Sequence, residues 1–209
     1  MIAIVDYGMG NLRSVEKAFE FAGGKVCITQ SSAKIESAKA LIVPGVGAFY
    51  DAMKNLQKRR LINPILKSIN KGKPFFGICL GMQILFSKSE EGIGCKGLDV
   101  LRGKVIRFQL SSKYKVPHMG WNTIVPANKN WNKVPLLNDI SRNSYVYFVH
   151  SYYPDPKDKQ IVIAKTTYEI EFASAIMSNN IYATQFHPEK SQQIGSKIIK
   201  NFIALVKKS

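Results

Sequence analysis

A cysteine set between two glycines is the residue of this sequence whose surroundings are best suited to chemistry. Cys79 follows the apolar run 74–78, has Gly77 and Gly81 two positions to either side, and is followed directly by a helix-forming segment. A buried strand that ends in such a turn lifts the sulfur above the sheet and leaves the backbone N–H of Leu80 free, as in a nucleophile elbow. The alternative is a structural cysteine in a turn, because cysteine is among the most buried residue types.

A cysteine nucleophile needs a base to take its proton and a third group to orient that base. The candidate base is His187 in the segment Gln-Phe-His-Pro-Glu at 185–189, and Glu189 can accept a hydrogen bond from the other ring nitrogen. An imidazolium beside Cys79 and the helix N-terminus after it would both favour the thiolate. In the alternative interpretation, His187 is a hydrogen-bonded turn histidine. His150 competes for the role of base, but its apolar strand favours a structural or substrate-lining part.

The elements that must position these residues change character along the chain. In the first half, short apolar strands at 2–7, 25–30, 40–43 and 74–78 alternate with helical stretches at 12–22, 50–57 and 61–70. Such alternation predicts a parallel sheet covered on both faces, with ligands at the C-terminal strand ends. The glycine-rich loops 44–47 and 77–81 both fall at that edge.

The second half reads as strands with little helix between them. We expect strands at 100–109, 121–126, 145–153 and 160–167, and a hairpin of 173–177 and 181–186 around Ser178-Asn179-Asn180. A final helix at 191–207 carries one apolar face, with Ser191 as its N-cap. The sequence therefore predicts an α/β fold, in which a mixed, largely parallel central sheet is flanked by helices and has an antiparallel extension.

Length and composition favour one globular domain spanning 1–209. The hydrophobic fraction is 45%, and no run approaches the roughly 20 apolar residues of a membrane helix. The start of the chain reads as a strand and not as a signal peptide, so we expect a cytoplasmic protein without a membrane partner. Three cysteines and three scattered histidines disfavour a disulfide framework and a metal centre.

The net charge of +16 raises the question of a nucleic-acid partner. The lysines are spread over helix faces and loops, and no helix-turn-helix or RNA-binding signature stands out. We therefore expect a solvated lysine-rich surface and no nucleic-acid partner. The segment Gly8-Met9-Gly10 is a weak candidate for a phosphate loop, since it lacks the third glycine and the acidic partner of a dinucleotide site.

The motifs at 77–83 and 185–189 together resemble those of class I glutamine amidotransferases, in their residues, order and spacing. That resemblance implies a Cys-His-Glu triad enzyme on a flavodoxin-like mixed sheet that needs no cofactor. Further segments at 6–12, 44–49, 117–122 and 147–152 are similar to the branch of the family that serves imidazole glycerol phosphate synthases as glutaminase subunits. The resemblance covers essentially the whole chain.

The expected reaction is hydrolysis of glutamine to glutamate and ammonia. The oxyanion needs two N–H donors, of which Leu80 is one by its position in the turn and Val46 is the second that the resemblance implies. The peptide plane of the loop 44–47 could flip and so act as a control. Gln83, one helical turn beyond Cys79, is placed to bond the α-amino-acid end of glutamine. Gly47, Ser151 and Tyr152 are further candidates for substrate contacts.

The resemblance also implies a partner for the ammonia. This would be a cyclase subunit with a (βα)₈ barrel, bound as a heterodimer, which makes imidazole glycerol phosphate and AICAR in histidine biosynthesis. Asn11, Trp121 and Lys190 stand where family members meet that barrel. The alternatives are that Asn11 caps a helix, that Trp121 is part of the core, and that Lys190 is solvated surface.

Two rival functions stay open at this point. A paralogous amidotransferase could supply ammonia to another synthase, for example one that adds an amidino nitrogen to a surface sugar, and its triad would be identical. A non-catalytic binding module of the same fold is the other rival, but intact residues at Cys79, His187 and Glu189 speak against it.

Overall fold

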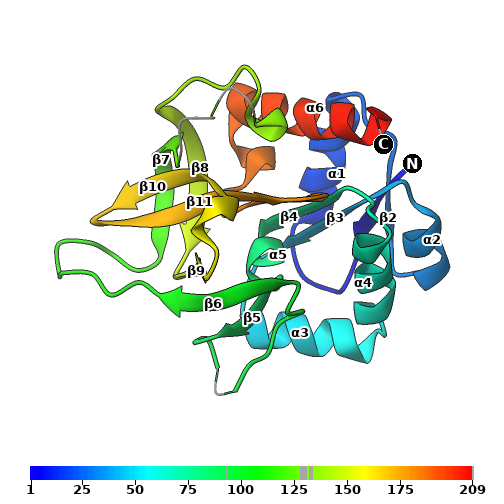
Figure 1. Ribbon diagram of the computed structural model, residues 1–209, viewed down its shortest axis with the longest axis horizontal. Helices are drawn as coiled ribbons and strands as arrows, with labels where there is room; N and C mark the ends of the chain where they lie inside the picture. The colour runs from blue at the N-terminus through cyan, green and yellow to red at the C-terminus, as the bar shows by residue number, and fades with distance from the viewer. Residues whose placement is uncertain (93, 128–130, 132–133, 209) are drawn as a thin grey trace.

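A nine-stranded mixed sheet forms the centre of the protein, and helices pack on both of its faces (Figure 1). The computed structural model describes residues 1–92, 94–127, 131 and 134–208. A second, three-stranded sheet lies beside the antiparallel half of the first, where β9 contacts β11 (Figure 1). The α/β class with a mixed sheet and an antiparallel extension is confirmed.

The elements of the described residues have the following bounds. The helices are α1 (Leu12–Phe21), α2 (Ser32–Ser37), α3 (Phe49–Lys58), α4 (Ile62–Asn70), α5 (Leu80–Gln83) and α6 (Gln192–Lys208). The strands are β1 (Ile2–Val5), β2 (Val26–Thr29), β3 (Ala40–Gly45), β4 (Phe75–Cys79), β5 (Phe86–Ser89), β6 (Leu101–Arg107), β7 (His118–Pro126), β8 (Ser144–His150), β9 (Tyr152–Pro156), β10 (Val162–Tyr168), β11 (Ile170–Ser178) and β12 (Ile181–Thr184). Short 3₁₀ turns are η2 (Pro135–Leu137), η3 (Lys159–Ile161) and η4 (Pro188–Lys190).

The strand order brings β4 and β12 side by side. It runs β2-β1-β3-β4-β12-β11-β10-β7-β8, with the first five strands parallel to one another and the remaining neighbours antiparallel. The predicted hairpin is therefore present as β11 and β12, and its second strand inserts next to β4. Because parallel strands end at one edge of a sheet, the residues that follow β3, β4 and β12 are brought together there.

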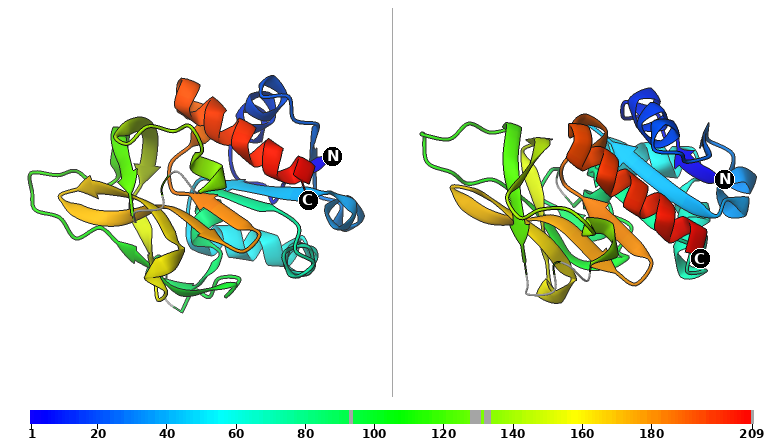
Figure 2. Two further views of the ribbon diagram at one scale, coloured as in Figure 1. Left: turned by 45° about the horizontal axis from the view of Figure 1, so that its top comes forward. Right: turned by 90° about the horizontal axis from the view of Figure 1, so that it is seen from above.

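Two apolar cores cover the two faces of the parallel half. Side chains alternate along β1, so that Ile2 and Ile4 belong to one core while Ala3 and Val5 belong to the other. The first core is completed by the predicted apolar stripes of α1 and α6, which lie side by side across the sheet (Figure 2). The second is completed by residues of α2, α3 and α4. Among the described residues, no helix combines the length and apolarity needed to cross a membrane.

The prediction of a single strand at 145–153 is wrong, because this segment belongs to two strands. β8 pairs with β7 in the large sheet, with His150 opposite His118, whereas β9 pairs with β6 in the small sheet, with Tyr153 opposite Ile106. The chain changes sheets at Ser151. Aromatic and β-branched residues occur on both sides of this point, so the partner strands are what reveal the break.

The sequence prediction also omits two elements. Helix α2 has six residues, too few for a readable period, and Ser31 caps it by accepting from the N–H of Lys34. Strand β5 is paired in parallel with β6 in the small sheet. In addition, β7 begins at His118, earlier than the expected start at Trp121.

Candidate active site

The turn between β4 and α5 presents Cys79 at the edge that β3, β4 and β12 share. Cys79 has φ 54° and ψ −106°, a conformation that non-glycine residues rarely adopt. Gly77 and Gly81 permit this turn because other backbone atoms come so close to them that a side chain would not fit. A Cβ on Gly77 would lie 2.5 Å from the carbonyl oxygen of Gly81, and a Cβ on Gly81 would lie 1.7 Å from that of Val43. Backbone packing therefore requires the Gly-x-Cys-x-Gly spacing.

His187 lies on the loop after β12, the parallel neighbour of β4. Thr184 is opposite Ile78 in this pair, so both strands deliver their next residues to the same edge. The N–H of His187 donates to the carbonyl of Tyr147 at 2.9 Å. The Ser191 hydroxyl donates to the carbonyl of His187 at 2.7 Å and accepts from the N–H of Tyr147 at 3.0 Å. Ser191, expected as a helix cap, thus uses its hydroxyl to tie the His187 loop to β8.

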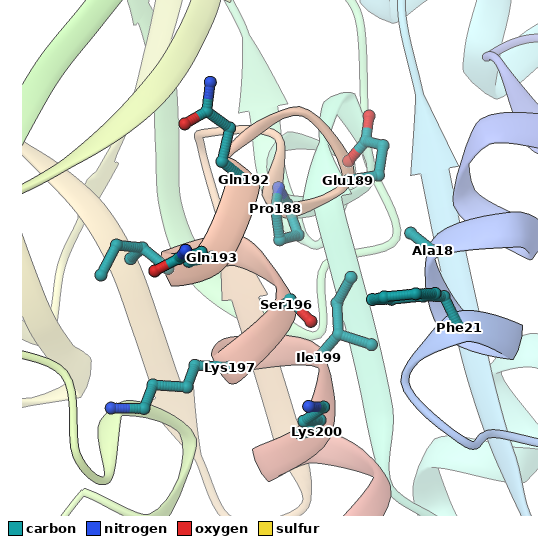
Figure 3. A pocket seen from close by; sticks show the side chains of 11 residues that line it. Ala18, Phe21, Pro188, Glu189, Gln192, Gln193, Ser196, Lys197, Ile199 and Lys200 are labelled. Carbon is teal, nitrogen blue, oxygen red and sulfur yellow. The ribbon is translucent and has the colours of Figure 1, made fainter.

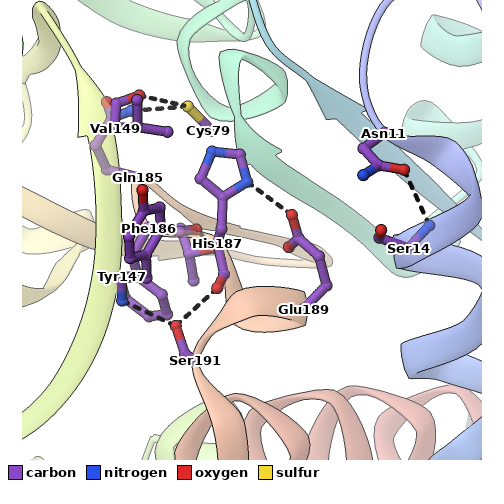
Figure 4. Close-up of polar contacts among 11 residues, drawn as sticks. Asn11, Ser14, Cys79, Tyr147, Val149, Gln185, Phe186, His187, Glu189 and Ser191 are labelled. Carbon is purple, nitrogen blue, oxygen red and sulfur yellow. Dashed lines mark hydrogen bonds and ion pairs between the residues drawn. The ribbon is translucent and has the colours of Figure 1, made fainter. Parts of the chain in front are cut away.

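The imidazole of His187 lies between Cys79 and Glu189 (Figure 4). Its Nδ1 is 2.7 Å from Glu189 Oε1, while its Nε2 faces Cys79 (Figure 4). Burial opposes a charge on this ring, but the Cys79 thiolate and the Glu189 carboxylate outweigh it and raise the pKa of His187 to about 10. At neutral pH the ring is therefore an imidazolium next to the sulfur.

The sulfur of Cys79 has two further polar neighbours (Figure 4). The Nε2 of Gln185 donates to Sγ at 3.5 Å, and Sγ lies 3.9 Å from the carbonyl oxygen of Val149. A carbonyl can only accept a hydrogen bond, so Cys79 can bond to the Val149 carbonyl only as a thiol. The Gln185 N–H can donate to the sulfur of the thiol or of the thiolate.

Cys79 opens into a cavity of about 390 Å³ that collects most of the predicted site residues. The lining residues are Val46, Gly47, Cys79, Leu80, Gln83, Glu91, Pro117, Val149, His150, Ser151, Tyr152 and Lys190. His187 and Glu189 lie behind the cysteine, and each of their side chains is 3% exposed. The cavity thus reaches the sulfur from one side while the histidine and the carboxylate approach it from the protein interior.

The two residues expected to supply oxyanion donors both line this cavity. Leu80 is the first residue of α5, a position whose N–H has no acceptor within the helix. Val46 follows β3 and is 40% exposed, and the next residue, Gly47, has a positive φ of 96°. The end of the loop 44–47 therefore borders the same cavity as the sulfur.

Three expected substrate contacts, Gln83, Ser151 and Tyr152, also line this cavity. Gln83 is buried, and its Nε2 donates to the carbonyl of Tyr152 at 2.8 Å and to Gln185 Oε1 at 3.1 Å. Ser151 sits at the change of sheet between β8 and β9. The amide nitrogen of Gln83 is thus already engaged, and its Oε1 is the end left for a ligand.

Two residues near the sulfur were absent from the sequence prediction. Glu91 lines the cavity, and its Oε2 accepts from the N–H of Phe49 at 2.7 Å. Gln185 is fully buried against the cysteine. A carboxylate in a loop outside both motifs gives no signal in one sequence. Gln185 lies inside the 185–189 motif, and its polar side chain directly after a buried strand was the signal available.

The two other histidines form a neutral pair. His118 Nδ1 lies 3.2 Å from His150 Nε2, and His150 Nδ1 lies 2.9 Å from the carbonyl of Tyr152. Burial lowers the pKa of His118 to about 4, and burial lowers that of His150 to about 3. Because the carbonyl only accepts, His150 carries its proton on Nδ1, and its Nε2 accepts a hydrogen bond from the Nδ1–H of His118. His150 therefore lines the cavity in a structural role, one of the alternatives expected for it.

All three residues expected at a partner interface are exposed. Asn11 is exposed and caps α1 by accepting from the N–H of Ser14 at 3.2 Å. Trp121 is 46% exposed, which excludes its assignment to the core, and packs edge-on against Tyr147. Lys190 is exposed and stands over the same tyrosine ring, 5.7 Å from its centroid. Trp121 and Lys190 therefore share Tyr147 as a support.

Comparison with models of protein families shows the family to which the chain belongs. The model of the class I glutamine amidotransferase family matches residues 3–206. The chain belongs to this family. The Geobacter sulfurreducens protein named imidazole glycerol phosphate synthase subunit HisH is 46% identical, with 96% of this chain and 97% of that protein covered. The protein of the same name from Methanocaldococcus jannaschii is 49% identical, with 99% and 100% covered.

Solved structures agree on the fold. A crystal structure of a glutamine amidotransferase has a TM-score of 0.75 at 18% identity and covers 99% of this chain and 100% of its own. The PurLQS structure from Thermotoga maritima has a TM-score of 0.73 at 18% identity and covers 98% and 97%. At such identities the likeness concerns the fold alone, which is that of class I amidotransferases.

A larger cavity of this amidotransferase, about 680 Å³, lies on the far side of the site between α1 and α6 (Figure 3). Ala18 and Phe21 of α1 face Ile199 of α6 across it, and Glu189 reaches it from the catalytic side. No cluster of metal-binding side chains occurs within the described part of the chain. The cavity that opens on Cys79 is the smaller of the two, and its lining includes the polar side chains of Gln83, Glu91 and Ser151.

Proposed function

We propose that this protein is the glutaminase subunit of an imidazole glycerol phosphate synthase and hydrolyses glutamine with Cys79, His187 and Glu189. The observation that carries the proposal is the buried His187 imidazole, bonded to Glu189 and directed at the sulfur of an elbow cysteine. Relatives that carry this subunit name match nearly the full length at 46% and 49% identity. We also propose that the whole chain forms one amidotransferase domain.

In the first half of the reaction the Cys79 thiolate attacks the side-chain amide carbon of glutamine. The His187 imidazolium gives its proton to the leaving nitrogen, so that ammonia departs and a glutamyl thioester forms. In the second half the neutral imidazole removes a proton from water, which attacks the thioester and releases glutamate. Glu189 holds the ring in the tautomer that keeps Nε2 toward the reacting atoms and stabilises the imidazolium.

The negative charge on the amide oxygen needs donors in both halves of the reaction. Leu80 N–H at the start of α5 and a backbone N–H at Val46 are the proposed pair. Loss of one such donor in another enzyme costs about 10²–10³ in turnover. Because Val46 belongs to an exposed loop with a glycine next to it, a change in that loop can turn the glutaminase on or off.

The cavity suits the α-amino-acid end of glutamine. Glu91 and the Oε1 of Gln83 are acceptors for its ammonium group, and Ser151 offers a hydroxyl, with Gly47 and Tyr152 completing the wall. The volume of about 390 Å³ is within the usual range for a small-molecule site. Glutamine therefore fits as the substrate with its amide toward Cys79.

The ammonia would pass to a cyclase subunit with a (βα)₈ barrel, bound as a heterodimer in the cytoplasm. The proposed contacts are Asn11, Trp121 and Lys190. Trp121 supports this assignment by being 46% exposed although it is a large aromatic residue, since such residues are enriched at interfaces. The partner would use the ammonia to form imidazole glycerol phosphate and AICAR.

The proposal is tested with Cys79→Ala in the complex with the cyclase. We expect this variant to lose glutamine-dependent synthesis and to keep synthesis from added ammonium salts. Equal loss of both activities would show that Cys79 is structural. The isolated subunit should turn glutamine over slowly, and the cyclase with its ligand should raise that rate, so a fast isolated subunit would refute the control by the loop 44–47.

A second measurement separates this pathway from a paralogous one. Expression of the protein with its cognate cyclase should allow a histidine-requiring strain that lacks the synthase to grow without histidine. Failure to grow, with both proteins present in soluble form, would assign the ammonia to another synthase while leaving the glutaminase chemistry in place.

A further inference from the structure

The orientation of the Gln83 amide is fixed by a group that can only accept a hydrogen bond. Gln83 Nε2 lies 2.8 Å from the carbonyl oxygen of Tyr152, which has no proton to give, so the NH₂ end must face it. The same nitrogen lies 3.1 Å from Gln185 Oε1. Both hydrogens of Gln83 Nε2 are therefore committed to protein acceptors.

The orientation of the Gln83 amide also fixes that of the Gln185 amide. Since Gln185 Oε1 accepts from Gln83, the Nε2 of Gln185 is turned the other way, and it lies 3.5 Å from the sulfur of Cys79. The Gln185 side chain is fully buried, and its backbone N–H donates to the carbonyl of Ser174 at 2.9 Å. The relay Tyr152–Gln83–Gln185 thus has one possible polarity, and it ends with an N–H aimed at the sulfur.

The Tyr152 carbonyl at the head of this relay is itself held from a second side. It accepts from His150 Nδ1 at 2.9 Å, and His150 is bonded to His118. Both histidines are buried and neutral, so His150 donates to the carbonyl as an uncharged ring. The acceptor that orients Gln83 is therefore fixed in place.

We propose that Gln185 is a positioning residue for the nucleophile, whose side-chain N–H holds the sulfur of Cys79 in the turn and stabilises it as the thiolate. The proposal deepens the proposed function, since it concerns the same site. The state of the sulfur can nevertheless be measured without glutamine.

The physical reason lies in the two polar neighbours of the sulfur. The Val149 carbonyl, at 3.9 Å, can receive only a thiol proton, whereas the Gln185 N–H strengthens its bond as negative charge gathers on sulfur. Together with the His187 imidazolium, Gln185 offsets the negative charge that gathers on the sulfur and fixes the direction from which the sulfur attacks. Once the thioester forms, the charge has left the sulfur and this bond weakens.

The relay also connects the sulfur to the substrate site. Gln83 lines the cavity, and the end of its amide that faces neither Tyr152 nor Gln185 is Oε1. A donor on a bound substrate that reaches Oε1 completes the set of bonds that hold Gln83 and, through it, Gln185.

The test uses Gln185→Met, which keeps the length of the side chain and removes the N–H. The full chain is treated with iodoacetamide between pH 5 and 9, and mass spectrometry of its peptides distinguishes Cys79 from Cys27 and Cys95. We expect alkylation of Cys79 at pH 7 to slow about tenfold, as for loss of a hydrogen bond to a charged group, with the pH profile moved to higher pH. In the complex, kcat should fall by a similar factor while KM for glutamine changes less than about twofold.

Ser174→Ala is the matched control. Ser174 is fully buried beside Gln185, and its hydroxyl has no hydrogen-bond partner among the described residues, so its removal leaves the relay intact. We expect the alkylation profile of this variant to equal that of the unaltered protein. Melting temperatures of both variants report any general loss of packing.

Gln83→Met tests the same relay from its other end. Without Gln83, the Gln185 amide is free to reverse, so alkylation of Cys79 should slow here too, whatever happens to substrate binding. An unchanged profile in either variant, in protein that still melts cooperatively, would overturn the proposal. Absence of glutamine turnover with every cyclase would refute the proposed function instead, and the alkylation result would stand.

Discussion

The carboxylate of Glu189 lies 2.7 Å from Nδ1 of His187, with both side chains shielded from solvent. A buried ion pair of this kind fixes both the tautomer and the charge of the ring. Glu189→Gln keeps the shape but removes the charge, so we expect kcat to fall about 10²–10⁴-fold, as for the equivalent change in serine enzymes, with KM for glutamine little altered. Steady-state glutamine hydrolysis in the complex measures this. A kcat within about threefold of the unaltered enzyme would contradict the role of Glu189.

The buried neutral histidines predict a loss of stability in acid. The pKa of His150 is lowered to about 3 and that of His118 to about 4, so the unfolded chain takes up protons below about pH 6.5 that the folded protein refuses. The contribution of these two histidines to stability is therefore complete above about pH 6.5 and declines as the pH falls toward these lowered values. His150→Gln should reduce the difference in unfolding free energy between pH 7 and pH 5 by about 2 kcal/mol. Urea titrations at the two pH values check this, and an unchanged difference would contradict it.

The close approach of the backbone at Gly81 predicts that alanine is not tolerated there. Its Cβ would lie 1.7 Å from the carbonyl oxygen of Val43, so β3 and the elbow must separate, and we expect Gly81→Ala to cost about 3 kcal/mol or more. Gly23→Ala is the control, since Gly23 has φ +86° but no atom within 4 Å of its Cβ position, and it should cost about 1 kcal/mol. Denaturant unfolding compares the two. Equal losses would show that the crowding at Gly81 relaxes easily.

The exposed indole of Trp121 predicts an anchor for the partner subunit. Trp121→Ala should weaken association with the cyclase about 30-fold, the effect of a typical aromatic hot spot, without lowering the melting temperature of the free subunit. Phe21→Ala is the matched control, because Phe21 is 84% exposed and borders the cavity between α1 and α6. Titration calorimetry measures both. A stronger effect at Phe21 than at Trp121 would move the interface to that other face.

Much of this arrangement follows from local sequence. The Gly-x-Cys-x-Gly spacing predicts the elbow because the two glycines are the positions where the backbone leaves no room for a Cβ. The strand and helix alternation of the first half, and the hairpin at β11 and β12, are also correct. The roles assigned to Cys79, His187 and Glu189 stay predictions, although the structure brings these side chains together.

The remainder depends on contacts that a local pattern does not contain. Whether 145–153 is one strand or two is decided by the partners β7 and β6, which come earlier in the chain. Glu91 reaches the cavity from a loop with no motif, and the partnership of Gln185 with Gln83 requires knowing that β12 inserts beside β4. Exposure likewise needed the fold, since Trp121 lies on strand β7 of the central sheet and is nevertheless 46% exposed.

The insertion of β12 between β4 and β11 has a consequence for the way in which the fold forms. Cys79 ends β4, whereas His187 and Glu189 follow β12, which comes much later in the sequence. The proposed nucleophile and its proposed base therefore meet only when β12 pairs with β4. We expect a folding intermediate that has formed the strands β1 to β4 but not this pairing to have no glutaminase activity.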